Sequence, residues 1–129
     1  MPATDAIVVL GHVPADPQTL FDAFLDAAAH AAMTGSGATS EEDGRFSAWG
    51  GYITGRTIET DAPHRIVQQW RTSQFPENAP DSRLEIRFSA VDGGSEVTFA
   101  HSNIPAGQGV SYEQGWVDHY LEPMRAWFG

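Results

Sequence analysis

The sequence contains no cysteine, which excludes disulfide bonds, a thiolate nucleophile and cysteine-ligated zinc. This composition fits a reducing compartment, and we expect a cytoplasmic protein. Lysine is also absent: all seven basic residues are arginines, and the formal net charge is −10. An acidic chain repels phosphate backbones, and nothing along the sequence concentrates the arginines into a stripe. We therefore expect no binding of nucleic acid.

Long hydrophobic runs are missing as well. No stretch approaches the roughly 20 apolar residues that cross a bilayer, so we expect no membrane-spanning segment. The residues from Met1 to Ala6 lack the basic and apolar regions of a signal peptide, and we expect none there. The sequence shows no repeat, low-complexity tract or linker. With 129 residues it fits one domain, residues 1–129, that is large enough to bury a continuous core.

The first part of the chain predicts a strand followed by a helix. Residues 7–13 are apolar and rich in β-branched side chains, which favours a strand. Asp16 and Pro17 are a typical helix start, because Asp caps free amides and Pro tolerates the first helical position. Apolar residues then recur at helical spacing, and we expect this helix to fade towards Met33. The acidic segment 40–44 predicts a solvated loop.

The middle of the chain has the two-residue period of β-strands. It predicts strands at 45–49, 52–60, 64–72 and 82–91, and a return strand that ends at 103. The strand at 82–91 is the clearest, because apolar and polar residues alternate along it; the inward residues would be Leu84, Ile86, Phe88 and Ala90. After a hairpin turn, the return strand places Val97, Phe99 and His101 on one buried face.

The end of the chain predicts an amphipathic helix from Val110 to Phe128, roughly 18 residues or about 27 Å long. Pro123 should kink it, because the bond to the carbonyl of His119 cannot form. The order of elements indicates an α+β fold in which this aromatic-rich helix covers the apolar face of an antiparallel sheet. Aromatic residues on both sides of that layer favour a cavity between sheet and helix.

Residues 46–55, with the sequence FSAWGGYITG, resemble the glycine-punctuated strand pair of the family homologous to the activator of the heat-shock-protein-90 ATPase. Residues 66–71 resemble the family's next strand. The end of the chain is also similar, with a hairpin followed by Asn103-Ile104-Pro105, Gly115-Trp116, Tyr120 and a terminal aromatic residue. This resemblance implies a START-like (SRPBCC) helix-grip fold, a curved antiparallel sheet wrapped around a long C-terminal helix.

The resemblance implies three alternative functions. Stand-alone relatives resemble non-enzymatic binders of a small apolar or aromatic molecule or a lipid, and this is our first hypothesis. The co-chaperone of the family implies instead a module that docks on a chaperone. Members of the wider superfamily are cyclases or dehydratases, in which His101 would act as a general acid or base. We expect no cofactor, and the oligomeric state stays open.

Seven inward-facing residues are the candidate ligand-binding residues: Gln68, Trp70, Phe88, Phe99, His101, Trp116 and Tyr120. The aromatic rings either line a pocket as flat apolar walls or form an ordinary core. His101 either contacts a ligand or is a buried histidine whose nitrogens have hydrogen-bond partners.

The last helix offers side chains of the kind that bind metals: Asp118, His119 and Glu122. Adjacent residues diverge by about 100° around a helix, so His119 points away from the face that the two carboxylates share. We therefore expect a solvated polar face and no metal site.

Overall fold

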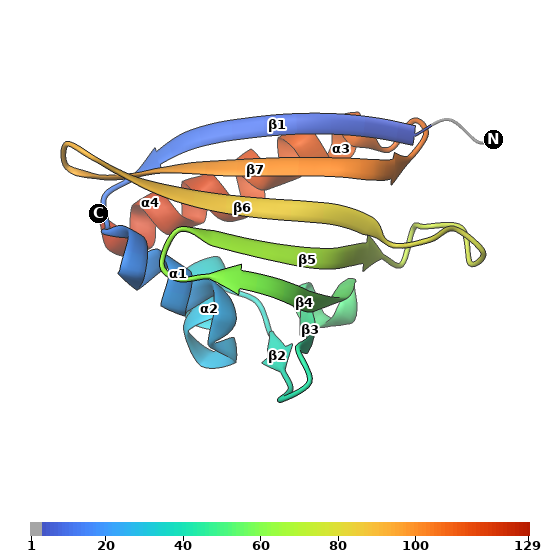
Figure 1. The fold of residues 1–129 in the computed structure, drawn as a ribbon, viewed down its shortest axis with the longest axis horizontal. Helices are drawn as coiled ribbons and strands as arrows, with labels where there is room; N and C mark the ends of the chain where they lie inside the picture. Colours follow the sequence, from blue (N-terminus) through green and yellow to red (C-terminus); the bar gives the residue numbers. More distant parts are fainter. Residues whose placement is uncertain (1–3) are drawn as a thin grey trace.

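The computed structural model describes residues 4–129, which form a curved antiparallel sheet of seven strands with helices packed against it (Figure 1). The order across the sheet is β1-β7-β6-β5-β4-β3-β2. The strands are β1 (Thr4–Val13), β2 (Thr39–Ser40), β3 (Arg45–Ala48), β4 (Ile53–Asp61), β5 (Arg65–Thr72), β6 (Ser82–Val91) and β7 (Gly94–Pro105). This arrangement confirms the predicted α+β helix-grip fold.

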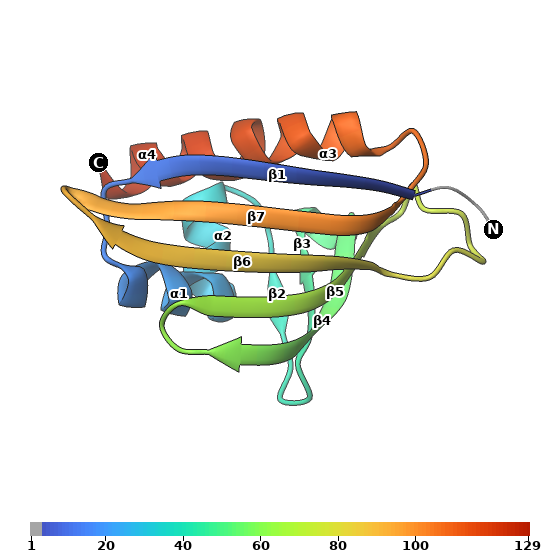
Figure 2. The same ribbon diagram turned by 45° about the horizontal axis from the view of Figure 1, so that its top comes forward.

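Three consecutive elements at the end of the chain form one long helix, which lies along β1 and β7 (Figure 2). They are α3 (Gly109–Trp116), the π-helical turn η2 (Val117–Leu121) and α4 (Glu122–Phe128). The other helical elements are α1 (Pro17–Leu25), α2 (Ala27–Thr34) and the 3-10 turn η1 (Trp49–Gly51). No helix in the described part of the chain is long and apolar enough to cross a membrane.

The helix predicted after Asp16 is divided into α1 and α2. Asp16 caps α1 as expected, because its carboxylate accepts from the backbone N–H of Thr19 at 3.1 Å. Asp26 has an extended backbone and caps α2 in the same way, by accepting from the N–H of Ala29 at 2.9 Å. The prediction of one continuous helix was wrong, because a second aspartate cap starts a new helix.

The long helix accommodates Pro123 by a change of helix type, and it does not end at the proline. The backbone N–H of Glu122 donates to the carbonyl of Val117, a bond that spans five residues and is typical of a π-helix. The wider turn directly precedes the proline, which lies in the first turn of α4, where its missing N–H costs little.

The core lies between the inner face of the sheet and the helices. One row of paired residues crosses four strands and is buried throughout: Val9, Phe99, Ile86 and Ile66. Leu121 and Met124 of the long helix and Phe24 of α1 cover this row. Ala90, expected to face the core, is exposed near the β6–β7 hairpin, where the sheet extends beyond its helical cover.

Gly55 lies where two strands approach too closely for a side chain. A Cβ atom there would collide with the backbone oxygen of Gln69 and lie 2.8 Å from the ring of Phe46. We expect Gly55→Ala to lower the free energy of unfolding by about 1–3 kcal/mol, because a strand backbone must move. The measurement is urea denaturation.

The control is Gly37→Ala, whose Cβ atom has nothing within 4 Å. This change should stay within about 0.5 kcal/mol of the wild type. Equal losses in both variants would contradict the close approach at Gly55.

Candidate functional site

An open groove of about 500 Å³ lies between one end of the sheet and the long helix. Its sheet side is formed by η1, the start of β4 and Trp70 of β5, and its helix side by α3 and η2. We call it the aromatic groove, and its aromatic lining residues are Trp49, Tyr52, Trp70, Tyr112, Trp116 and Tyr120.

The turn η1 forms the rim of the aromatic groove on the sheet side. Three consecutive residues, Trp49 to Gly51, have left-handed φ angles of 53°, 64° and 93°. Two of them are glycines, which adopt this conformation without steric cost, whereas it is unfavourable for Trp49. The ring of Trp49 contacts His119 edge-to-face, with centroids 5.0 Å apart, so the turn reaches across to the helix at the rim.

Stacked rings form the floor of the aromatic groove. Trp116 lies flat on Phe99 of the core, with centroids 4.6 Å apart and an interplanar angle of 11°. Tyr120 stacks on Phe24 in the same way at 5.7 Å. Trp70 meets Tyr112 edge-to-face at 5.0 Å. These separations are those of favourable aromatic pairs, so the floor is a packed extension of the core.

The polar atoms of three floor residues, Tyr112, Trp116 and Tyr120, are held by partners in the protein. The Tyr112 hydroxyl donates to Gln108 Oε1 and lies 2.7 Å from the Thr72 hydroxyl. The Tyr120 hydroxyl lies 2.7 Å from His30 Nε2, and Trp116 Nε1 donates to His101 Nδ1 at 3.2 Å. Because these polar atoms are already bonded, the floor offers ring surfaces to whatever enters the groove.

Trp49 differs from the floor residues. Its Nε1 atom is buried and has no hydrogen-bond partner among residues 4–129. A buried unpaired donor is unfavourable. Hydrogen bonding is therefore less complete at Trp49 on the rim than at Tyr112, Trp116 and Tyr120 on the floor.

His101 belongs to a hydrogen-bonded chain whose direction is fixed at both ends. Trp116 Nε1 only donates, so His101 Nδ1 accepts. At the other end, the carbonyl of Trp70 accepts from Ser82 Oγ at 2.6 Å, so Ser82 accepts from His101 Nε2–H at 2.8 Å. Burial lowers the pKa of His101 to about 3, and the ring is therefore neutral.

His30 is a second buried histidine, which the sequence analysis missed because the alanine-rich segment around it has no clear period. Its Nδ1 donates to the carbonyl of Phe24 at 3.2 Å, so its Nε2 accepts from the Tyr120 hydroxyl. Burial lowers the pKa of His30, although the bond to Phe24 opposes that shift. Burial also raises the pKa of Tyr120 far above its usual value, so this contact joins two neutral groups.

The structure distributes the seven predicted site residues over three places. Trp70, Trp116 and Tyr120 line the aromatic groove. Gln68 lines a second pocket of about 240 Å³, beside α2 and β3, where its Nε2 donates to Thr57 at 3.2 Å. The other three lie in the closed core behind the floor: Phe88, Phe99 and His101.

The aromatic groove residues that the sequence analysis missed are Trp49, Tyr52 and Tyr112. Tyr112 precedes Trp116 and Tyr120 at intervals of four, so helical spacing alone was sufficient to find it. The polar residues Asp118 and His119 are exposed at the groove. Within residues 4–129, no three potential metal-ligating side chains of His, Asp or Glu come together.

The two buried histidines predict how stability depends on pH. The pKa of each is lower in the fold than its value near 6.5 in the unfolded chain, so the unfolded chain takes up these protons first as the pH falls. Their contribution to stability is therefore complete above that pH and is lost as the pH falls. We expect the free energy of unfolding to fall by up to about 1.4 kcal/mol per pH unit for each histidine. This loss should begin at pH values above the range in which carboxylates titrate. Urea denaturation at a series of pH values measures the slope.

His101→Gln should reduce this slope, since one of the two titrating groups is gone. A His101→Gln variant with the full wild-type slope would show that His101 takes up protons in the folded state.

Comparison with known proteins supports the fold and assigns a family. The family model "Activator of Hsp90 ATPase homolog 1-like protein" matches residues 14–129. An activator of 90 kDa heat shock protein ATPase homolog from Dictyostelium discoideum is 29% identical over 98% of this chain and 34% of its own length. The human homolog 1 is 28% identical over 88% of this chain, again 34% of its own length.

The chain thus spans about a third of the length of these curated relatives. A solved structure of an HSP90 activator from Plasmodium falciparum superposes with a TM-score of 0.82 and 27% identity, covering 98% of this chain and 96% of the other. Because the family model matches nearly the whole sequence, the chain belongs to the family of Activator of Hsp90 ATPase homolog 1-like proteins.

Proposed function

We propose that the aromatic groove binds a small apolar or aromatic molecule or a lipid, without catalysing a reaction on it. The main support is that three floor residues, Tyr112, Trp116 and Tyr120, turn their polar atoms to protein partners and their rings to the groove. The volume of about 500 Å³ also lies in the range of roughly 300–1,000 Å³ that small-molecule sites occupy. The cysteine-free composition fits a cytoplasmic location, which we include in the proposal.

The enzymatic alternative, a cyclase or dehydratase that uses His101, has less support. His101 is 1% exposed and does not line the groove, and both of its ring nitrogens are engaged in hydrogen bonds. A general acid or base has to reach the substrate directly or through one water molecule. In this arrangement Trp116 lies between the imidazole and the groove and holds its Nδ1.

Gly115 provides a test of the aromatic groove. It lines the groove, and a Cβ atom there would be 3.9 Å from the nearest atom, in His119, so a larger side chain fits without a clash. Gly115→Leu should fill the space and weaken the binding of an apolar probe, such as the fluorescent dye N-phenyl-naphthylamine, by about tenfold or more. The expected loss of binding free energy is that of one leucine-sized apolar contact surface, about 1.5–3 kcal/mol, and about 1.4 kcal/mol corresponds to a tenfold change in affinity. Fluorescence titration measures the affinity.

Glu113→Leu is the matched control, because Glu113 is exposed on the same helix and does not line the groove. It adds the same side chain and should bind the probe like the wild type. Native mass spectrometry and solvent extraction of the purified wild type should also recover a bound apolar molecule. Equal affinities in both variants, or no probe binding to the wild type, would refute the proposal.

A second candidate function is docking on a chaperone. It is supported by the matching relatives, whose names describe activators of the 90 kDa heat shock protein ATPase, and by the likeness to the Plasmodium falciparum activator. The chain spans about a third of the length of these curated relatives. We therefore propose docking on the chaperone separately from the full ATPase activation that the names of the longer relatives describe.

For this second function we expect the chain to bind purified heat-shock protein 90 in a pull-down and to raise its ATPase rate. Gly115→Leu separates the two functions: it should leave chaperone binding intact while blocking the aromatic groove. Recovery of no chaperone, together with an unchanged ATPase rate, would count decisively against docking.

A further inference from the structure

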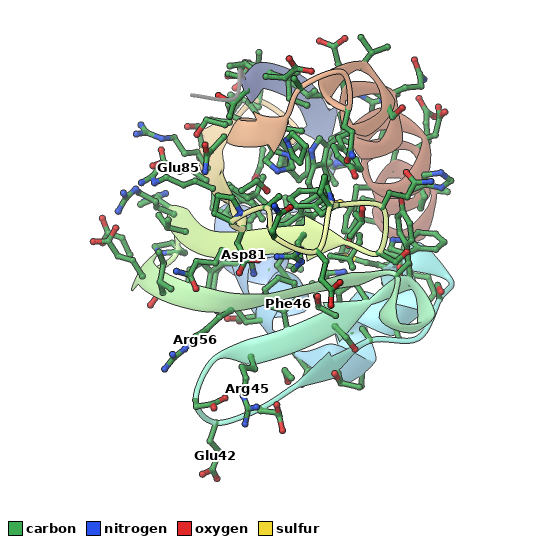
Figure 3. The ribbon with its side chains drawn as sticks, turned by 90° about the vertical axis from the view of Figure 1, so that its right-hand side faces the viewer. Glu42, Arg45, Phe46, Arg56, Asp81 and Glu85 are labelled. Carbon is green, nitrogen blue, oxygen red and sulfur yellow. The ribbon has the colours of Figure 1, made fainter. Side chains whose placement is uncertain are left out.

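The outer face of the sheet, which points away from the helices, gathers almost all of the positive charge of the chain. Paired residues of antiparallel strands share a face, and one outer row runs through Arg45, Arg56, Gln69 and Arg83. Six of the seven arginines lie on this face: Arg45, Arg56, Arg65, Arg71, Arg83 and Arg87. Figure 3 shows Arg56 and Glu85 there. Strand pairing therefore builds the arginine cluster that the linear sequence does not show.

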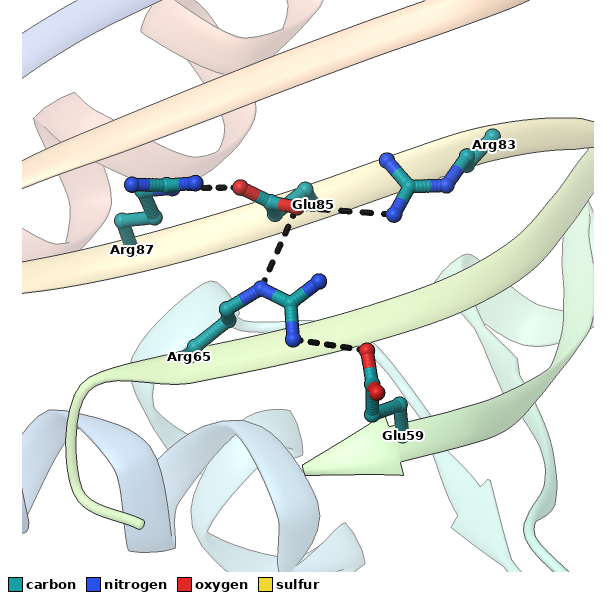
Figure 4. Close-up of polar contacts among 5 residues, drawn as sticks. All are labelled: Glu59, Arg65, Arg83, Glu85 and Arg87. Atoms are coloured by element: carbon teal, nitrogen blue, oxygen red, sulfur yellow. Dashed lines mark hydrogen bonds and ion pairs between the residues drawn. The ribbon is translucent and has the colours of Figure 1, made fainter. Parts of the chain in front are cut away.

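Glu85 is the centre of this cluster (Figure 4). Its side chain is 9% exposed, and its carboxylate contacts three guanidinium groups: Arg65 Nε at 3.2 Å, Arg83 Nη2 at 3.5 Å, and Arg87 Nε. Burial raises the pKa of Glu85, but hydrogen bonds from Arg87 and Arg65 outweigh this effect and hold the pKa below its usual value. One ionised carboxylate thus orients three cations.

The three arginines around Glu85 outnumber the two carboxylates that contact them, Glu85 and Glu59. Arg65 and Arg87 are direct cross-strand partners, a position in which like charges repel, and the Glu85 carboxylate contacts both of them. Arg83 and Arg87 have side chains 51% and 61% exposed, and each contacts Glu85 through one nitrogen. A guanidinium group carries five N–H donors, so both present further donors to solvent.

Apolar side chains adjoin the arginines on the same face. Val8 and Leu10 of the edge strand β1 are 59% and 57% exposed. Through β7, Val8 lies in the row of Glu85 and Leu10 in the row of Arg87. β1 and β6 are two strands apart, about 10 Å, which is within the reach of one peptide segment. The face thus combines an apolar strip with organised N–H donors.

We propose that the outer face of β1, β7, β6 and β5 docks an extended acidic polypeptide segment of a partner protein. Its carboxylates accept hydrogen bonds from Arg83 and Arg87, and its apolar side chains cover Val8 and Leu10. This site lies across the sheet from the aromatic groove and goes beyond the function proposed for the groove.

A nucleic acid fits this face less well. Glu59 and Glu85 are interleaved with the arginines of the outer face. Evenly spaced phosphates meet both signs of charge there, whereas a peptide can place carboxylates at the arginines and uncharged side chains at the acids. Exposed valine and leucine also favour a polypeptide.

The test uses a fluorescein-labelled peptide of alternating glutamate and valine, with fluorescence anisotropy on the full chain. We expect binding that weakens as salt is added. Arg83→Gln combined with Arg87→Gln should weaken it about tenfold, the sum expected of two exposed charge pairs. The control is Arg125→Gln on α4, which removes the same charge per substitution away from this face and should change affinity less than about twofold.

The proposal would be overturned if the wild type did not bind the peptide, or if Arg125→Gln weakened binding as much as Arg87→Gln alone. It would also be overturned if a peptide with glutamine in place of glutamate bound equally well, or if single-stranded oligothymidine bound more tightly than the peptide. The groove variant Gly115→Leu should bind the peptide normally. A loss there would place the peptide in the groove and likewise contradict docking on the outer face.

Discussion

The contact of Trp116 with the sheet fixes how the long helix lies on the core. Its indole ring stacks on Phe99 at 4.6 Å, and its N–H donates to the buried, neutral His101. Stacking sets the distance of the helix from the sheet, and the hydrogen bond sets its rotation. Tyr112 and Tyr120, one turn on either side, then fall on the floor of the aromatic groove, so its shape follows from this one contact.

Periodicity was sufficient to predict the α+β class and many of the buried side chains, whereas the helix-grip fold came from the family resemblance. The alternation in β6 and β7 correctly placed Phe88, Phe99 and His101 inside, and the apolar stripe of the last helix placed Trp116 and Tyr120. Local patterns failed where the backbone changes within one residue, as at the cap Asp26 and at the left-handed Trp49. They also failed for contacts between distant segments, which a single sequence does not encode in any spacing.

Contacts between residues that are far apart in the sequence determine the chemistry of both candidate sites, and sequence spacing does not reveal them. His30 and Tyr120 are 90 residues apart, yet their hydrogen bond turns the tyrosine hydroxyl away from the groove. Arg65 and Arg87 become neighbours only because β5 pairs with β6. In both cases a polar side chain acquires its role from a long-range partner, so residue type predicted the role incompletely.

Strand β5 connects the two faces. Trp70 points inward and contributes to the floor of the groove, while Arg65 points outward to Glu85. Between them, Val67 is 1% exposed although it shares the outer face with Glu85, so the outer side chains cover it. Arginine stems can cover apolar surface while their charged ends remain in water. The arginine cluster therefore shields the sheet as well as carrying charge, and glutamine, which keeps part of the stem, removes the charge with less loss of cover than alanine would.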